Sequence, residues 1–286
     1  MLETKKIVAG LLLLVVGTGC GESSIAVDST VGRPYDGPVQ IDRKPNSGDA
    51  AERAGAAALA LECDGAAYDG GGGDYADGGL ESVQADPGKA LSNFWGEAAS
   101  SSDHPRDGYV VERVDDDRVL FSHDVGRETK VAFIAANGIR DWNEDEGWGI
   151  ESWAQCDPAE LPADVTADLG IQVWERNGHR VPVSKITSFP GSDHCDWQDI
   201  TFLTIGPYGD QSPSFLRDAT GELDDLLQTT FDARADLPAD AEDTGFGHNG
   251  RHLWLAPDDS AAYLVRTSDR RDVERWPAAK ETIWCA

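Results

Sequence analysis

An acidic segment in the middle of the chain offers the clearest set of side chains that could bind a metal ion. It runs from Asp141 to Gly147 and places side-chain oxygens at alternate positions, on Asp141, Asn143 and Asp145. Calcium sites in proteins are built from carboxylate and amide oxygens with such spacing. The match is incomplete, because Glu146 stands where the standard loop requires glycine. The segment therefore predicts either a calcium site or an acidic surface loop, and the sequence indicates no other cofactor.

Six histidines are candidate general bases or metal ligands, but their spacing gives no catalytic set. His248 and His252 are four residues apart, a spacing that brings two ligands onto one face only in a helix. Asn249-Gly250 lies between them and favours a tight hairpin turn instead. None of the motifs Gly-x-Ser-x-Gly, Ser-x-x-Lys or His-Glu-x-x-His occurs, so the sequence assigns no catalytic residue.

Cys20 carries the strongest chemical prediction because of the residues that precede it. Residues 1–19 have a charged start, an apolar run from Ile7 to Val16 and then small residues, which is the order of a secretory signal peptide. The apolar run is too short to cross a bilayer, which takes about 20 residues. The small residues before Cys20 resemble the lipobox of bacterial lipoproteins, although Gly17 stands where that motif usually has an apolar residue. The alternative is an ordinary signal peptide with an incidental cysteine.

The resemblance to a lipobox implies a location and a partner. In that family the cysteine thiol is acylated, with palmitate among the acyl chains, and the chain is cleaved directly before it. A diacyl or triacyl group is sufficient for stable membrane anchoring. We therefore expect a chain anchored to the extracytoplasmic face of the cell membrane through a lipid on Cys20.

The charge of the chain argues against nucleic acid as a partner. It contains 24 Lys and Arg against 52 Asp and Glu, which gives a formal net charge of −28. Phosphate binding needs patches of Lys and Arg that this chain lacks. The acidic residues are spread along the sequence, which favours a solvated acidic surface over a dedicated cation-binding segment.

The other four cysteines predict disulfides. Cys63, Cys156, Cys195 and Cys285 are an even number in a chain expected to be exported, where disulfides persist. Four cysteines allow three pairings, of which we expect Cys63–Cys156 and Cys195–Cys285, because each would close one of the two domains inferred below. A zinc site is the alternative, but no Cys-x-x-Cys spacing occurs. A catalytic role for Cys195 beside His194 is disfavoured, because a thiol held in a disulfide is not a nucleophile.

Composition and periodicity predict an α+β fold, mainly antiparallel β, in two domains. Residues 1–19 form the signal peptide, and residues 20–48, rich in Gly, Ser, Pro and Asp, form a flexible tether. Residues 49–157 form an α+β domain, and residues 170–286 form a mostly β domain. The intervening residues, with two prolines among acidic side chains, are expected to be the junction.

In the first domain we expect helices followed by an antiparallel meander. Asp49 caps an alanine-rich helix over Ala50–Leu61, and Asp86 with Pro87 begins a second. The seven glycines of residues 64–79 predict no regular element. A helix is expected to cover one face of a sheet whose strands are residues 109–114, 118–125, 129–136 and 147–156.

Tryptophans near the acidic segment raise the question of an aromatic platform for sugar rings. Trp148 and Trp153 are five residues apart in one expected strand. Residues at odd separation point to opposite faces of a regular strand. We therefore expect these side chains to pack in the core rather than to form a platform.

In the second domain we expect strands almost throughout. Asn177-Gly178 has the residue types of a type I′ hairpin turn. Apolar and β-branched residues predict strands over residues 170–176, 179–186, 199–205, 253–256, 261–267 and 272–276.

Three segments resemble those of uncharacterised exported actinobacterial lipoproteins. They begin at Arg118, Gly147 and Leu253, and the resemblance would cover most of residues 60–286. It implies an envelope location and no particular activity.

Two functions are compatible with these features. The favoured one is a non-enzymatic envelope lipoprotein that binds a ligand or a protein partner, because no acid, base and nucleophile set is found. The alternative is an extracellular hydrolase acting on cell-wall material, since pairs of Asp and Glu are abundant. Two carboxylates facing each other across a cleft would favour the hydrolase.

Overall fold

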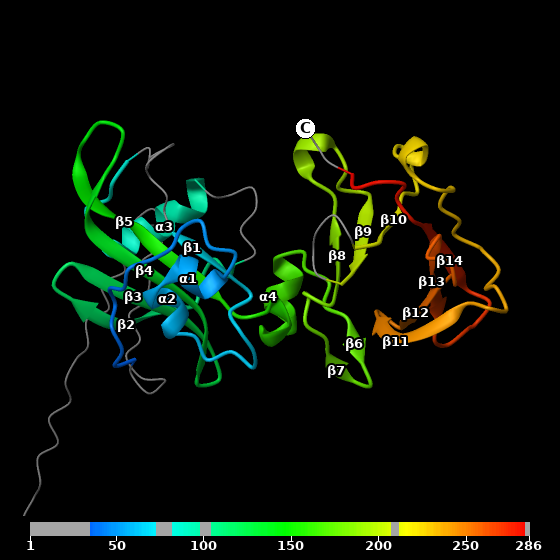
Figure 1. Ribbon diagram of the computed structural model, residues 1–286, viewed down its shortest axis with the longest axis horizontal. Helices are drawn as coiled ribbons and strands as arrows, with labels where there is room; N and C mark the ends of the chain where they lie inside the picture. The colour runs from blue at the N-terminus through cyan, green and yellow to red at the C-terminus, as the bar shows by residue number, and fades with distance from the viewer. Residues whose placement is uncertain (1–34, 73–81, 98–103, 207–211, 284–286) are drawn as a thin grey trace, which may run out of the picture.

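The computed structural model describes residues 35–72, 82–97, 104–206 and 212–283. Two β-rich domains lie side by side, and α4 (Ala163–Asp168) lies between them (Figure 1). Within these residues, no helix has the length and apolar character needed to span a membrane. The signal peptide, Cys20 and Cys285 lie outside the described residues.

The first domain is built on one antiparallel sheet of five strands in the order β1-β5-β4-β3-β2. Short turns join the last four strands along the chain, and these four are the predicted meander. Their β-branched and aromatic residues alternate between two buried faces, which explains why they form strands. The strands are β1 (Asp69–Gly72), β2 (Tyr109–Asp115), β3 (Arg118–Val125), β4 (Glu128–Arg140) and β5 (Glu146–Gln155).

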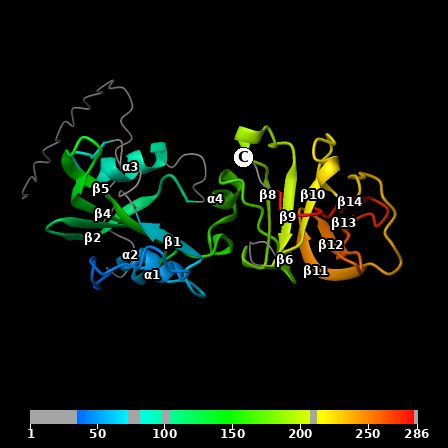
Figure 2. The ribbon, with the colours of Figure 1, turned by 45° about the horizontal axis from the view of Figure 1, so that its top comes forward.

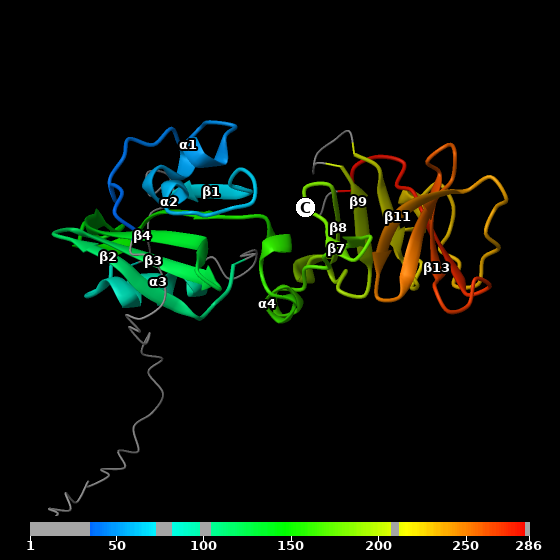
Figure 3. The same ribbon diagram turned by 90° about the horizontal axis from the view of Figure 1, so that it is seen from below.

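Helices cover both faces of this sheet, and not one face as predicted. α3 (Pro87–Glu97) packs on one face, while α1 (Ala50–Ala54) and α2 (Ala56–Leu59) pack on the other (Figure 2 and Figure 3). The α3 face buries large side chains, including Leu91, Phe121 and Phe133. The opposite face is packed mainly by alanines of α1 and α2 against Leu120 and Ile134, among others.

The alanine-rich helix is split in two at a glycine. Asp49 caps α1 as predicted, because its carboxylate accepts the backbone N–H of Ala51 and of Glu52. Gly55 then takes a φ of +58°, a left-handed conformation that favours glycine, and the chain resumes as α2. Asp86 also acts as predicted, since it accepts the N–H of Lys89 at the start of α3.

The prediction of no regular element in the glycine-rich residues 64–79 is wrong for β1, which pairs with β5. The cause is the helix above it. A Cβ added at Gly70 would lie 2.9 Å from the Cβ of Ala54 and 3.0 Å from the carbonyl oxygen of Ala50. Position 70 of β1 therefore requires glycine, because α1 approaches the strand there too closely for a side chain.

A β-bulge in β5 changes which side chains share a face. Ile134 pairs with Ser152 while its neighbour Ala135 pairs with Ile150, so Glu151 is an extra residue. Trp148 and Trp153 consequently both pack against the core on the α3 face. The expectation that they lie on opposite faces is wrong, because it assumed an unbroken strand.

One of the two predicted disulfides is described. Cys63 and Cys156 are bonded and tie the segment after α2 to the end of β5. Cys195 is also disulfide-bonded, whereas the predicted pairing of Cys195 with Cys285 stays a prediction because Cys285 lies outside the described residues.

The second domain consists of two antiparallel sheets whose edges meet. One sheet has the strand order β10-β9-β8 and the other β14-β13-β12-β11-β6-β7. Bridges between Gln172 and Ser188 and between Phe215 and Ala278 join them at both sides. The strands thus close into a ring around a core that includes Trp174, Phe215 and Trp276. The strands are β6 (Glu175–Arg176), β7 (His179–Arg180), β8 (Ile186–Pro190), β9 (Thr201–Ile205), β10 (Ser214–Arg217), β11 (Glu242–His248), β12 (Arg251–Leu255), β13 (Ala261–Arg266) and β14 (Val273–Pro277).

The turn predictions in this domain are confirmed. Asn177 and Gly178 have φ values of +54° and +77° and join β6 to β7. Asn249 and Gly250, at +48° and +71°, make a second turn of this kind between β11 and β12. β8, β10 and β11 were not predicted. The strand expected over residues 179–186 ends after β7 at Arg180, and β8 begins only at Ile186. Gly245 and Gly247 interrupt the apolar pattern of β11, and β10 is only four residues long.

Residues 157–169, which the sequence indicates as the domain junction, make contacts on both sides. Asp157 is buried, and one of its oxygens accepts both the N–H of Ala159 and the N–H of Val183 in the second domain. Arg180 donates to the carbonyl of Leu161 and to the hydroxyl of Thr166. These contacts attach α4 to the second domain, while Leu161 packs in the core of the first.

The close approach of α1 to β1 predicts a sensitive glycine. Gly70→Ala should lower the free energy of unfolding by about 1–3 kcal/mol, because its Cβ overlaps backbone and Ala54. Gly65→Ala is the matched control, since no atom lies within 4 Å of its added Cβ. That variant should be neutral or more stable by about 0.4–1 kcal/mol. Denaturant unfolding measures both, and equal effects at the two positions would contradict the packing described.

Candidate functional site

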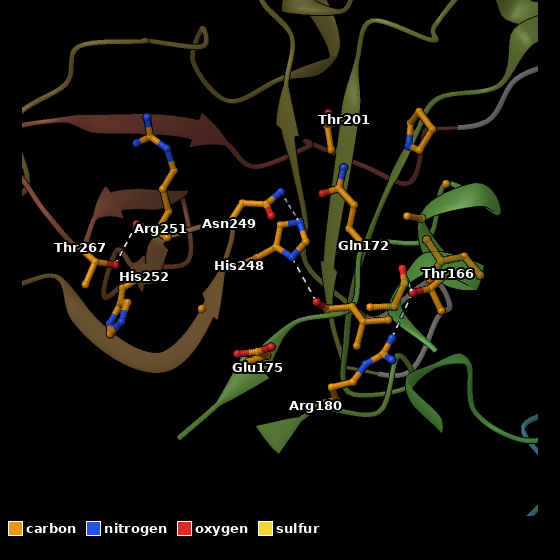
Figure 4. A pocket seen from close by; sticks show the side chains of 18 of the residues that line it. Thr166, Gln172, Glu175, Arg180, Thr201, His248, Asn249, Arg251, His252 and Thr267 are labelled. Carbon is orange, nitrogen blue, oxygen red and sulfur yellow. Dashed lines mark hydrogen bonds between the residues drawn. The ribbon is translucent and has the colours of Figure 1, made fainter. Parts of the chain in front are cut away.

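Polar side chains converge in a groove between α4 and the second domain (Figure 4). Its volume is about 810 Å³, within the range of roughly 300–1,000 Å³ typical of ligand sites. It is lined by residues of α4, of the segment before β6, and of the β11–β12 hairpin. The polar side chains of its lining are Thr166, Gln172, Glu175, Arg180, Gln198, Thr201, His248, Asn249, Arg251, His252 and Thr267.

His248 lies at the middle of the groove with both ring nitrogens occupied. Nδ1 lies 3.1 Å from the carbonyl oxygen of Val173, which can only accept, so Nδ1 carries the proton. The amide Nδ2 of Asn249 donates to Nε2 at 2.9 Å. Burial lowers the pKa of His248, while the Val173 hydrogen bond and the charge of Glu175 oppose the shift. The ring is therefore neutral at pH 7 and acts as a fixed support for Asn249.

Gln172 is held beside His248 by a chain of hydrogen bonds from the core. The indole N–H of Trp174 donates to the Ser188 hydroxyl at 3.0 Å, and that hydroxyl donates to Oε1 of Gln172 at 2.7 Å. With Oε1 engaged, the amide is oriented with Nε2 as its remaining donor. Figure 4 shows Gln172 and Asn249 flanking the His248 ring, with Thr201 nearby.

The arginines of the groove are committed to other protein groups. Arg180 is bound to Leu161 and Thr166, and burial lowers the pKa of its guanidinium. Arg251 turns its guanidinium away from His248 (Figure 4) and binds Asp272 at 2.8 Å and Glu274 at 3.2 Å. The groove therefore presents no uncommitted guanidinium among its described lining residues.

His248 and His252 do not form a metal pair. Across the hairpin His248 is paired with Arg251, and Gly247 with His252. The two histidines therefore differ by one pair position and point to opposite faces of the ribbon. This agrees with the turn predicted from Asn249-Gly250.

The residues expected to bind calcium lie at the tip of the β4–β5 hairpin, which Asp141 caps. Oδ1 of Asp141 accepts the N–H of Asn143 at 2.8 Å and of Asp145 at 3.0 Å. Asn143 and Asp145 are exposed. Among the described His, Cys, Asp and Glu side chains, the three metal-ligating groups found close together are Cys63, Cys156 and Glu160, whose sulfurs are joined in the disulfide. The calcium site at Asp141, Asn143 and Asp145 stays a prediction.

Two further histidines are buried in the first domain. Nδ1 of His104 lies 2.7 Å from Oε1 of Gln155, and its ring packs edge-on against Trp153. Burial lowers the pKa of His104 to about 4. His123 is bound to the carbonyl of Asp107, and burial lowers its pKa as well. Among the described contacts, no histidine ring is hydrogen-bonded to a serine, cysteine or carboxylate side chain.

Part of this site is predictable from the amino-acid sequence. The Asn249-Gly250 turn was visible, and it fixes the place of His248 and Asn249. The role of Gln172 could not be predicted from its neighbours in the sequence. It lies in the groove because the adjacent Val173 contacts His248, which is 75 residues away in the chain.

Comparisons of the chain with protein-family models, with curated proteins and with solved structures find no match. The resemblance to exported actinobacterial lipoproteins therefore stays a prediction.

The buried histidines predict that acid destabilises the fold. His104 binds a proton more weakly in the folded chain, at a pKa of about 4, than in the unfolded chain, at about 6.5. Its contribution is complete above pH 6.5 and is lost as the pH falls towards 4, by up to about 3 kcal/mol. His123 and His248 shift in the same direction.

Denaturant unfolding between pH 4 and pH 7 measures this loss. His104→Gln should flatten the dependence of stability on pH, because glutamine does not titrate. His179→Gln, at an exposed position of β7, should keep the wild-type dependence. An unchanged slope in His104→Gln would show that His104 is not the group responsible.

Proposed function

We propose that this chain is a non-enzymatic lipoprotein of the cell envelope, anchored through Cys20, whose second domain binds a ligand in the groove beside α4. The observation that carries this is the fixed pair of amides, Gln172 and Asn249, held by His248 and Ser188 in a hollow of about 810 Å³. Side chains oriented by hydrogen bonds behind them are typical of binding sites.

The chemistry of the groove supports binding over hydrolysis. A general base must be able to accept a proton from substrate or water, and both nitrogens of His248 are engaged. Most glycoside hydrolases use two carboxylates flanking the bond that is cleaved. Among the described lining residues, Glu175 is the only carboxylate. The alternative of a wall hydrolase receives no specific support from this geometry.

The anchor and the charge fit together in this proposal. The tether predicted over residues 20–48 is too long, because residues 35–48 pack on the first domain, where Val39 is buried and the carbonyl of Gly37 accepts from Arg113. Residues 20–34, as a flexible coil, would span on the order of 20 Å. The chain's net charge of −28 would repel an anionic bilayer surface. The domains would thus be held near the membrane by the lipid and away from its surface by electrostatic repulsion.

The proposed lipid anchor predicts that replacing the sulfur of Cys20 by oxygen releases the protein from the membrane. In Cys20→Ser the acceptor thiol is replaced by a hydroxyl, so the protein should leave the membrane fraction and fail to incorporate an alkyne-labelled palmitate. Cell fractionation and labelling of intact cells measure both. Cys195→Ser is the control for loss of a cysteine. A Cys20→Ser protein that remains labelled and membrane-bound would contradict the anchor and leave the groove untouched.

Filling the groove should abolish ligand binding. Ala167 lines the groove from α4, whereas its exposed neighbour Asp168 does not. A ligand raises the melting temperature of the state that binds it. Oligosaccharide and small-molecule fractions of the cell envelope should therefore stabilise the wild type and Asp168→Trp, but not Ala167→Trp.

Thermal unfolding monitored with each fraction measures this effect. Equal stabilisation of Ala167→Trp and Asp168→Trp would place the ligand elsewhere, and no stabilisation by any fraction would contradict the proposed function. Mass spectrometry of the fraction after incubation provides the test for hydrolysis, because accumulating products would identify an enzyme.

A further inference from the structure

The groups left for a ligand in the groove are neutral and of both hydrogen-bonding types. Gln172 keeps Nε2 as a donor, since its Oε1 accepts from Ser188. Asn249 keeps its side-chain oxygen as an acceptor, since its nitrogen donates to His248. The hydroxyl of Thr201, which both donates and accepts, lines the same groove.

Charged ligands are disfavoured by the same contacts. The guanidinium groups of Arg180 and Arg251 are bound to protein acceptors, and Glu175 opposes the approach of an anion. A cation would meet a single carboxylate, whereas protein sites for cations gather several oxygen ligands. The remaining ligand class is neutral and polar.

Among neutral ligands, an extended peptide would meet a backbone that is already partly paired along the segment that carries Gln172. The N–H of Gln172 donates to Ser188, and the carbonyl of Val173 accepts from His248. The N–H of Ile171 donates to Thr166, and Pro190 has no N–H to offer. Strand addition needs unpaired backbone groups, so hydroxyl groups are the better partners for the free amides.

We infer that the groove binds a neutral saccharide, with Gln172 donating to and Asn249 accepting from its hydroxyl groups. This inference rests on the proposed function of the groove as a ligand site. The described lining residues include no tryptophan, tyrosine or phenylalanine on which a sugar ring could stack. Binding therefore relies on hydrogen bonds exchanged with water, each of which contributes little net affinity, and we expect weak, saturable binding.

Calorimetric titration of the full-length chain tests the ligand class. The probes are maltotriose, cellotriose and tri-N-acetylchitotriose as neutral saccharides, glucose 6-phosphate as an anion, and trialanine as a peptide. At least one neutral trisaccharide should bind, and it should shift the amide NMR signals of residues 247–252. Glucose 6-phosphate and trialanine should not.

Two variants test the residues. Gln172→Ala removes the free donor, and Asn249→Gly removes the acceptor while keeping a residue suited to the φ of +48°. Each should weaken saccharide binding roughly five- to tenfold, as expected for one lost hydrogen bond. Asn143→Ala, an exposed amide on the first domain, is the matched control and should bind as the wild type does. Melting temperatures of all three establish that they fold.

The outcomes separate this inference from the proposed function. The absence of binding by all three neutral saccharides, or binding unchanged in both groove variants, would overturn the saccharide assignment. Binding of glucose 6-phosphate or trialanine that is weakened by Gln172→Ala would also overturn it, while leaving the groove as a ligand site. The proposed function is tested separately, by the stabilisation that envelope fractions give to the wild type and by its loss in Ala167→Trp.

Discussion

The second domain depends on the segment from Gln172 to Arg176, because it belongs to both sheets. Its first residue bridges to Ser188 of β8, and its last two pair with β7 and β11. This pairing closes the ring of strands around Trp174. The same segment carries Gln172 and presents the carbonyl of Val173 to His248. The strand pairing that closes the ring therefore also positions the groups of the groove.

The junction between the domains supplies the opposite wall of the groove. α4 is attached to the second domain by Arg180, which binds Leu161 and Thr166, and Asp157 accepts the N–H of Val183. Val165 and Leu169 of the same region pack on the core of the first domain. Groups that are buried and charged are stable only when paired. We therefore interpret Arg180 as a residue that holds α4 against the second domain, and not as a contact for an anionic ligand.

How well the sequence predicts this structure follows from which features are local. Hairpins were found because Asn-Gly turns and strand periodicity are read over a few residues, and caps at Asp49 and Asp86 are equally local. β1 was missed because Gly70 is required by the close approach of α1, which is not adjacent to it in the sequence. The facing of Trp148 and Trp153 was misjudged because the bulge at Glu151 depends on pairing with β4. The groove was not predicted, because its two amides, Gln172 and Asn249, come from segments far apart in the chain.

The electrostatic character of the groove differs from that of the rest of the molecule. The chain has 52 acidic residues, yet a single carboxylate is found among the described lining residues, and the arginines there are neutralised by Asp272 and Glu274 or bound by α4. An acidic surface repels anions at long range and lowers their local concentration. A neutral ligand is not repelled in this way, and oriented amides in the groove are sufficient to bind it. An acidic exterior and a neutral, pre-oriented interior are therefore mutually consistent features of a protein that binds uncharged ligands.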